Sequence, residues 1–172
     1  MQNVDETFVV PINSDQPRFI HNTSERFESR WSTLTVLKSN SVLLHGMEGA
    51  TIGVWVAHGE GKLHCSKEQL HHITNHHQAP LRYVDDNNCI TTHYPENPNG
   101  SPDGIAALLS PCGRHLAMMP HPERCFANFQ IPYASLEQRR QMREVGAAPW
   151  IRMFTNAAAF CKSTANSDVI VT

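Results

Sequence analysis

The sequence lacks a strong excess of charge and lacks a long hydrophobic run. It has 16 acidic and 14 basic residues among 172, for a formal net charge of −2. This balance excludes a broad electrostatic surface for nucleic acid or an anionic membrane. No apolar run reaches the roughly 20 residues that cross a bilayer, so we expect no membrane-spanning helix. Residues 1–6 have neither a basic nor an apolar signal region, so no secretory leader is predicted.

Paired cysteines are also missing. The five cysteines are scattered, their number is odd, and no Cys-x-x-Cys occurs. Neither a disulfide framework nor a zinc knuckle is therefore indicated, and a reducing, cytoplasmic setting is expected. None of the cysteines lies in the Gly-x-Cys-x-Gly setting of an activated nucleophile, so all five are interpreted as structural.

Histidine is what the sequence has in excess. There are eleven histidines, against three tyrosines and three tryptophans. Because the imidazole group titrates near neutral pH, this excess indicates acid–base chemistry, a metal site or a solvated surface. The length and the hydrophobic content of 40% suit one domain with a buried core.

Hydrophobic patterning predicts a mixture of strands and helices. Period-two or continuous apolar segments indicate strands over 33–37, 41–44, 51–57, 81–84, 89–92, 105–109 and 115–119. Capping signals and 3.6-residue spacing indicate helices over about 67–77, 135–145 and 150–161. This mixture favours an α/β protein.

The strongest catalytic candidate is the Pro-His-Pro-Glu segment at residues 120–123, which follows an apolar strand. In an extended segment, alternate side chains point the same way, so His121 and Glu123 would share a face. A carboxylate beside an imidazole stabilises the imidazolium that a general base forms. One His-x-Glu is expected by chance in this composition, so the spacing alone leaves a surface role open.

A second His-x-Glu, His58-Gly59-Glu60-Gly61, also stands at a strand end. The glycines could adopt positive φ and let a ligand approach the backbone. The alternative is a glycine turn with one exposed histidine. The cluster at 71–77 offers His72 and His76 at i,i+4, which could share a metal ion. No carboxylate or cysteine lies nearby to complete such a site, so a solvated helix is favoured and no metal site is predicted.

Several short segments together resemble the glutaminase domain at the C-terminus of phosphoribosylformylglycinamidine synthases, enzymes of purine synthesis. The resemblance covers about residues 16–162 and lies in Gln16–Phe19, Asn22–Glu28, Ala57–Gly61, Arg82–Asp85, Asn97–Pro102, Met118–Arg124 and Pro149–Phe154. It implies a class I (triad) glutamine amidotransferase with a partial flavodoxin-like α/β fold, a mixed sheet flanked by helices. Residues 1–16 would then be a lead-in, 17–162 the partial domain and 163–172 a frayed tail.

The resemblance also implies the site. His121 and Glu123 would complete a Cys–His–Glu triad, and His58 and Gly59 would line the glutamine pocket. Ammonia from glutamine would then serve the amidation of formylglycinamide ribonucleotide. ATP and Mg²⁺ would belong to synthetase domains of the same enzyme or of a partner chain, with no cofactor bound by this chain.

One departure from the family pattern affects activity. The nucleophilic cysteine of the family lies in a Gly-rich elbow upstream of the Pro17-Arg18-Phe19 block, and no cysteine precedes Pro17 here. We therefore expect the chain alone to be inactive and to expose apolar surface that binds a partner or a second copy. A non-catalytic docking fragment and a histidine-rich metal-binding protein are the alternative hypotheses.

Overall fold

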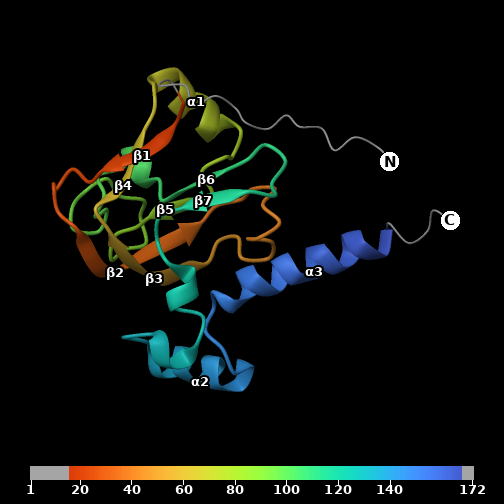
Figure 1. Cartoon of the computed structure of the whole chain (residues 1–172). Helices are drawn as coiled ribbons and strands as arrows, with labels where there is room; N and C mark the ends of the chain where they lie inside the picture. Colours follow the sequence, from red (N-terminus) through yellow and green to blue (C-terminus); the bar gives the residue numbers. More distant parts are fainter. Residues whose placement is uncertain (1–15, 168–172) are drawn as a thin grey trace.

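The computed structural model describes residues 16–167, which form a β-rich body with three α-helices (Figure 1). Its strands form three small antiparallel sheets. These pair β1 (Arg18–His21) with β4 (Glu60–His64), β2 (Glu28–Val36) with β3 (Thr51–His58) and β5 (Leu81–Tyr83), and β6 (Ala107–Leu109) with β7 (Leu116–Met118). The predicted lead-in at 1–16 lies almost entirely outside the described residues, as do residues 168–172.

The long β2–β3 pair provides the framework of the core. Trp31 lies opposite Trp55, and their rings meet edge to face with centroids 5.1 Å apart. The opposite face carries buried side chains at alternate positions, as the period of two requires. Val54, Val56 and His58 are the buried residues of β3, so the core-facing row of this strand ends on a histidine.

Trp150 connects the C-terminal part of the chain to this framework. Its side chain is fully buried, and its indole Nε1 donates to the backbone oxygen of Gly53 at 2.8 Å. Gly53 also leaves room for Trp31, because a Cβ at this position would lie 2.2 Å from the Trp31 ring. One small residue on β3 therefore accommodates two tryptophans.

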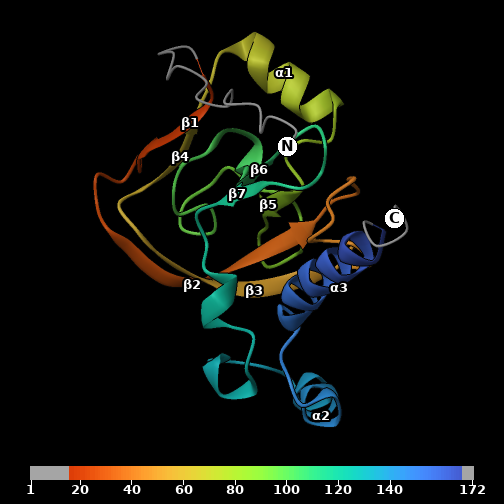
Figure 2. The ribbon, with the colours of Figure 1, turned by 45° about the vertical axis from the view of Figure 1, so that its right-hand side comes forward.

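The three helices begin at or next to the predicted positions. They are α1 (Lys67–Asn75), α2 (Leu136–Val145) and α3 (Ile151–Ser167). Ser66 and Ser135 each form a capping box with the glutamine three residues later. Gly146 ends α2 in the left-handed conformation, with φ 78°. In both views α1 and α2 lie at opposite ends of the body (Figures 1 and 2).

Most of the predicted elements are confirmed, with shifted boundaries, and two of the predicted strands differ from the structure. Residues 41–44 form no strand and lead into a turn, in which the Leu44 N–H donates to the Ser41 hydroxyl at 3.3 Å. The Leu44 side chain is buried although the residue lies in a turn. Its apolar character therefore reflects burial and does not indicate a strand. Within 89–92, Ile90 forms only an isolated bridge to Val84.

The last helix continues past residue 161 into the segment for which we expected a frayed tail. The Ser163 hydroxyl donates to the backbone oxygen of Phe160 at 2.8 Å, and the Thr164 hydroxyl does so to that of Cys161 at 3.0 Å. Small polar side chains thus bond within the helix here. Among residues 16–167, no helix is long and apolar enough to cross a bilayer.

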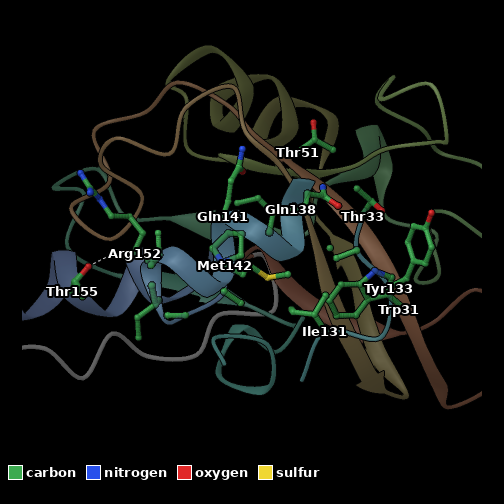
Figure 3. A pocket seen from close by; sticks show the side chains of 18 of the residues that line it. Trp31, Thr33, Thr51, Ile131, Tyr133, Gln138, Gln141, Met142, Arg152 and Thr155 are labelled. Carbon is green, nitrogen blue, oxygen red and sulfur yellow. Dashed lines mark hydrogen bonds between the residues drawn. The ribbon is translucent and has the colours of Figure 1, made fainter. Parts of the chain in front are cut away.

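The C-terminal helices leave much apolar surface uncovered. No side chain between 151 and 164 in α3 is buried, and Phe129, Tyr133 and Leu136 are 89%, 77% and 85% exposed. A groove of about 810 Å³ runs between β2, β3, α2 and the start of α3. Trp31 and Tyr133 lie at one end of it, Arg152 and Thr155 lie at the other, and Met142 is between them (Figure 3).

We expect the isolated chain to self-associate through this surface, because exposed apolar patches of this kind drive association. Light scattering over a range of protein concentrations should show a mass rising above 19.3 kDa. The double variant Phe129→Ser/Leu136→Ser should associate less, whereas Arg143→Ser on the same helix should not change the mass. A single species of 19.3 kDa at all concentrations would contradict the expectation.

Candidate active site

The candidate general base, His121, is held where two strands come together. It follows β7, and its backbone N–H donates to the Trp55 oxygen on β3 at 2.8 Å. The chain then enters a 3₁₀ turn, η2 (Pro122–Arg124), in which the Arg124 N–H donates back to the His121 oxygen at 3.1 Å. Pro122 suits this first helical position because its φ is restricted and its missing N–H is not needed there. The backbone of the histidine is therefore fixed on both sides.

His121 and Glu123 form a close pair. Nδ1 of His121 lies 2.7 Å from Oε1 of Glu123. The residues meet across the 3₁₀ turn and not along an extended segment, so our reason for expecting the pair was wrong although the two side chains do meet. An ionised carboxylate only accepts hydrogen bonds, so Nδ1 carries a proton and Nε2 of a neutral ring keeps its lone pair. This is the arrangement of an oriented general base.

His58 lies beside this pair but in a different environment. It is 7% exposed, and its ring centroid is 6.4 Å from that of His121. Burial lowers the pKa of His58, and the nearby charge of His121 acts in the same direction. The alternative of an exposed histidine in a glycine turn is therefore wrong for residue 58.

A buried hydrogen-bond network surrounds His58. Nδ2 of Asn99 lies 2.7 Å from Nε2 of His58 and 2.7 Å from Oδ1 of Asn22. The Tyr83 hydroxyl donates to Oδ1 of Asn99 at 2.6 Å. Asn22, Asn99 and Tyr83 are each at most 2% exposed, so each polar atom needs its partner.

Gly59 and Gly61 have different roles from the one we expected. Neither has positive φ. A Cβ at Gly61 would lie 2.3 Å from Nδ2 of Asn99 and 2.4 Å from Nε2 of His58, whereas a Cβ at Gly59 would meet nothing within 4 Å. The close approach thus occurs at Gly61 and is made by Asn99 from this chain.

The structure places none of the five cysteines as an activated nucleophile for His121. The thiol of Cys125 is buried and donates to the backbone oxygen of His121 at 3.2 Å, and burial raises its pKa to about 11. Cys112 is exposed in the β6–β7 turn, at the end of the hairpin away from His121. All five thiols are free.

The histidine cluster at 71–77 lies on α1 and the residues just after it. His72 and His76 stack with ring centroids 4.0 Å apart, and Nδ1 of His76 bonds to the backbone oxygen of His72. Within residues 16–167, no group of three or more histidines, cysteines or carboxylates is placed to hold a metal ion. The large groove is also separate, because neither His58, His121 nor Glu123 lines it.

Sequence reasoning missed Asn22, Asn99 and Tyr83 as site residues. One signal could have found them: each lies in a different segment of the family resemblance, and the structure brings these segments together around His58. Segments of the resemblance that are far apart in the sequence therefore lie close together in the structure.

Comparisons with known families and relatives also indicate a glutamine amidotransferase domain. A model described as a CobB/CobQ-like glutamine amidotransferase domain matches residues 3–161. The chain is 50% identical over 153 residues to a probable chloroplastic/mitochondrial phosphoribosylformylglycinamidine synthase of Arabidopsis thaliana, covering 88% of this chain and 11% of the relative. It is 46% identical over 150 residues to the Dictyostelium discoideum phosphoribosylformylglycinamidine synthase, with coverages of 86% and 11%. The chain thus spans about a tenth of the length of these curated relatives.

Among solved structures, the chain is similar to PurLQS from Thermotoga maritima. The TM-score is 0.56 at 22% identity, and the match covers 85% of this chain and 53% of that one. This likeness concerns the fold and confirms the predicted α/β class.

The two glycines of the His-Gly-Glu-Gly segment provide a matched stability test. Gly61→Ala should lower the free energy of unfolding by about 1–3 kcal/mol, because its methyl group would displace the buried Asn99 or His58 side chain. Gly59→Ala should change it by less than about 0.5 kcal/mol. Urea unfolding followed by tryptophan fluorescence measures both. Equal stability of the two variants would show that Gly61 is not closely packed.

Proposed function

Because this chain belongs to the family of CobB/CobQ-like glutamine amidotransferase domains, we propose that it supplies the acid–base half of the glutaminase site of a phosphoribosylformylglycinamidine synthase. The observation that carries the proposal is the His121–Glu123 pair, held at 2.7 Å on a turn whose backbone is hydrogen-bonded on both sides. Identities of 43–50% to enzymes with this name support the assignment.

The proposed reaction is hydrolysis of the glutamine side-chain amide. A cysteine gives its thiol proton to Nε2 of His121 and attacks the carboxamide carbon as the thiolate. The C–N bond then breaks as the leaving nitrogen takes this proton from Nε2, which releases ammonia. His121 then accepts a proton from the water that attacks the glutamyl thioester, giving glutamate and free thiol. Glu123 stabilises the imidazolium and keeps its ring oriented. The ammonia serves the amidation of formylglycinamide ribonucleotide.

The nucleophile in this proposal comes from a segment other than these 172 residues. Cys125, the cysteine bonded to the His121 backbone, has its thiol turned to carbonyl oxygens and its pKa raised by burial, so it is a poor thiolate source. We infer that synthetase domains, in the same enzyme or in a partner chain, use ATP and Mg²⁺. No residue of this chain is assigned to either of them.

Two further assignments belong to the proposal. We assign Gly59 to the glutamine pocket, because its position next to His58 leaves room on its α-carbon. His58 would support this pocket from the buried side. The five free thiols suit a reducing compartment such as the cytoplasm. The Arabidopsis relative is named as chloroplastic/mitochondrial.

The purified chain should release no glutamate from glutamine above the uncatalysed rate, because no described cysteine forms a triad with His121 and Glu123. A coupled glutamate dehydrogenase assay measures this. Turnover comparable with that of intact glutaminases, abolished by His121→Ala, would contradict the expectation and would require one of the five cysteines to be the nucleophile.

A chimera tests the function itself. The matching 153 residues of the Arabidopsis relative are replaced by those of this chain, and amidation is measured with glutamine or with ammonium salt. We expect activity with both nitrogen donors. His121→Ala should lower the glutamine-dependent rate by roughly 10⁴- to 10⁶-fold, because loss of one triad member removes covalent catalysis. It should leave the ammonium-dependent rate unchanged.

The control for the chimera is His72→Ala, which removes an exposed histidine of α1 and should affect neither rate. A chimera that uses ammonium salt but not glutamine would contradict the proposal and would favour a non-catalytic docking role. Glutamine use that survives His121→Ala would contradict the assigned base.

A further inference from the structure

The donors and acceptors of the buried network around His58 can be assigned, starting from the backbone oxygens, which only accept hydrogen bonds. Nδ2 of Asn22 lies 2.9 Å from the backbone oxygen of Arg26 and 2.8 Å from that of His58. Carbonyl oxygens only accept, so both N–H groups of Asn22 are used and its orientation is determined. Its Oδ1 is therefore the atom that faces Asn99.

The orientation of Asn99 follows from that of Asn22. The Asn99 atom 2.7 Å from Oδ1 of Asn22 must be a donor, which identifies it as Nδ2. The flipped amide would place two oxygens in contact and would direct the Tyr83 hydroxyl at an NH₂ group, in place of Oδ1 at 2.6 Å. One N–H of Asn99 donates to Asn22, and the other is directed at Nε2 of His58, 2.7 Å away.

This second N–H determines the state of His58. A hydrogen bond with Asn99 raises the pKa of His58 only if the amide oxygen faces Nε2 and accepts from the protonated ring. The atom present is a donor, so Nε2 must offer its lone pair and a neutral ring carries its proton on Nδ1. Protonation of Nε2 would place two N–H groups against each other at 2.7 Å inside the core.

The charged and polar groups around His58 do not determine its tautomer in place of Asn99. Glu28 on β2 favours the protonated ring, but it is 3% exposed, lies 2.5 Å from Arg30 and accepts from the Ser24 hydroxyl. The Met119 carbonyl also favours protonation, yet Nδ1 of His58 has no hydrogen-bond partner among the described residues. On the other side, 6.4 Å away, is His121, which is paired with Glu123.

We propose that Asn99 is a positioning residue that holds His58 as the neutral tautomer with its proton on Nδ1, so that His121 alone of the two neighbouring imidazoles carries a positive charge. The catalytic consequence rests on the proposed function: a second cation beside His121 would oppose the imidazolium that protonates the leaving ammonia. The tautomer itself does not depend on that function.

The test is the ring tautomer of His58 in the isolated chain. Long-range ¹H–¹⁵N NMR of histidine-labelled protein distinguishes a protonated from an unprotonated ring nitrogen, and loss of one signal set in His58→Gln assigns the residue. We expect a protonated Nδ1 and an unprotonated Nε2, and we expect this state to persist as the pH is lowered below the usual histidine range, because burial lowers the pKa of His58. A protonated Nε2 on His58 in the neutral ring, or protonation of His58 at the ordinary histidine pKa, would overturn the proposal.

Substitution of the donor provides the second measurement. Asn99→Asp replaces the N–H with an acceptor, so His58 should gain a proton on Nε2 and its titration should move to higher pH. Asn87→Asp makes the same change in an exposed turn and should leave the His58 spectrum unchanged. An unchanged tautomer in Asn99→Asp, or an equal effect of Asn87→Asp, would overturn the role of Asn99. If Asn99→Asp does not fold, the spectrum of the unsubstituted chain still decides.

The two proposals can fail independently. A tautomer found as expected, together with a chimera that cannot use glutamine, would refute the proposed function and leave the role of Asn99 standing. A glutamine-using chimera in which His58 is protonated on Nε2 would do the reverse.

Discussion

The side-chain amide of Asn99 holds the candidate site together. It accepts from Tyr83 at the end of β5, donates to Asn22 after β1 and donates to His58 at the end of β3. These residues come from separate elements, and all are buried. Any shift of one element would leave a buried donor or acceptor without a partner, which costs free energy. The network therefore stabilises the relative positions of the ends of β1, β3 and β5.

The two histidines illustrate how local environment separates similar residues. Each belongs to a His-x-Glu sequence at or just after the end of a strand. His121 pairs with its own Glu123, whereas the ring of His58 is paired with Asn99. Glu60, the carboxylate of the second motif, lies 3.7 Å from His21 on the surface. His121 thus has the orientation of a base, and His58 has the burial and hydrogen bonding of a support.

Local patterns were good guides to the elements. Period-two burial in β3 and the serine–glutamine capping boxes of α1 and α2 are determined by residues close in sequence, so they could be predicted. The absence of a strand at 41–44 could not, because an apolar residue such as Leu44 is buried equally well from a turn or a strand. The antiparallel arrangement in three sheets also depends on pairings between distant segments.

The sequence by itself determined that His121 and Glu123 stand two residues apart on a proline-restricted segment, whereas the 3₁₀ turn that brings their side chains to 2.7 Å was seen only in the structure. It also determined, through its ordered segments, the family that the 3–161 match shows. Only the tertiary structure decided that Asn22 contacts Asn99, 77 residues away, and that Asn99 donates to His58. No periodicity or spacing in the sequence predicts that these asparagines are buried. Their partners are chosen by which strand ends pack together, and that follows from the whole core.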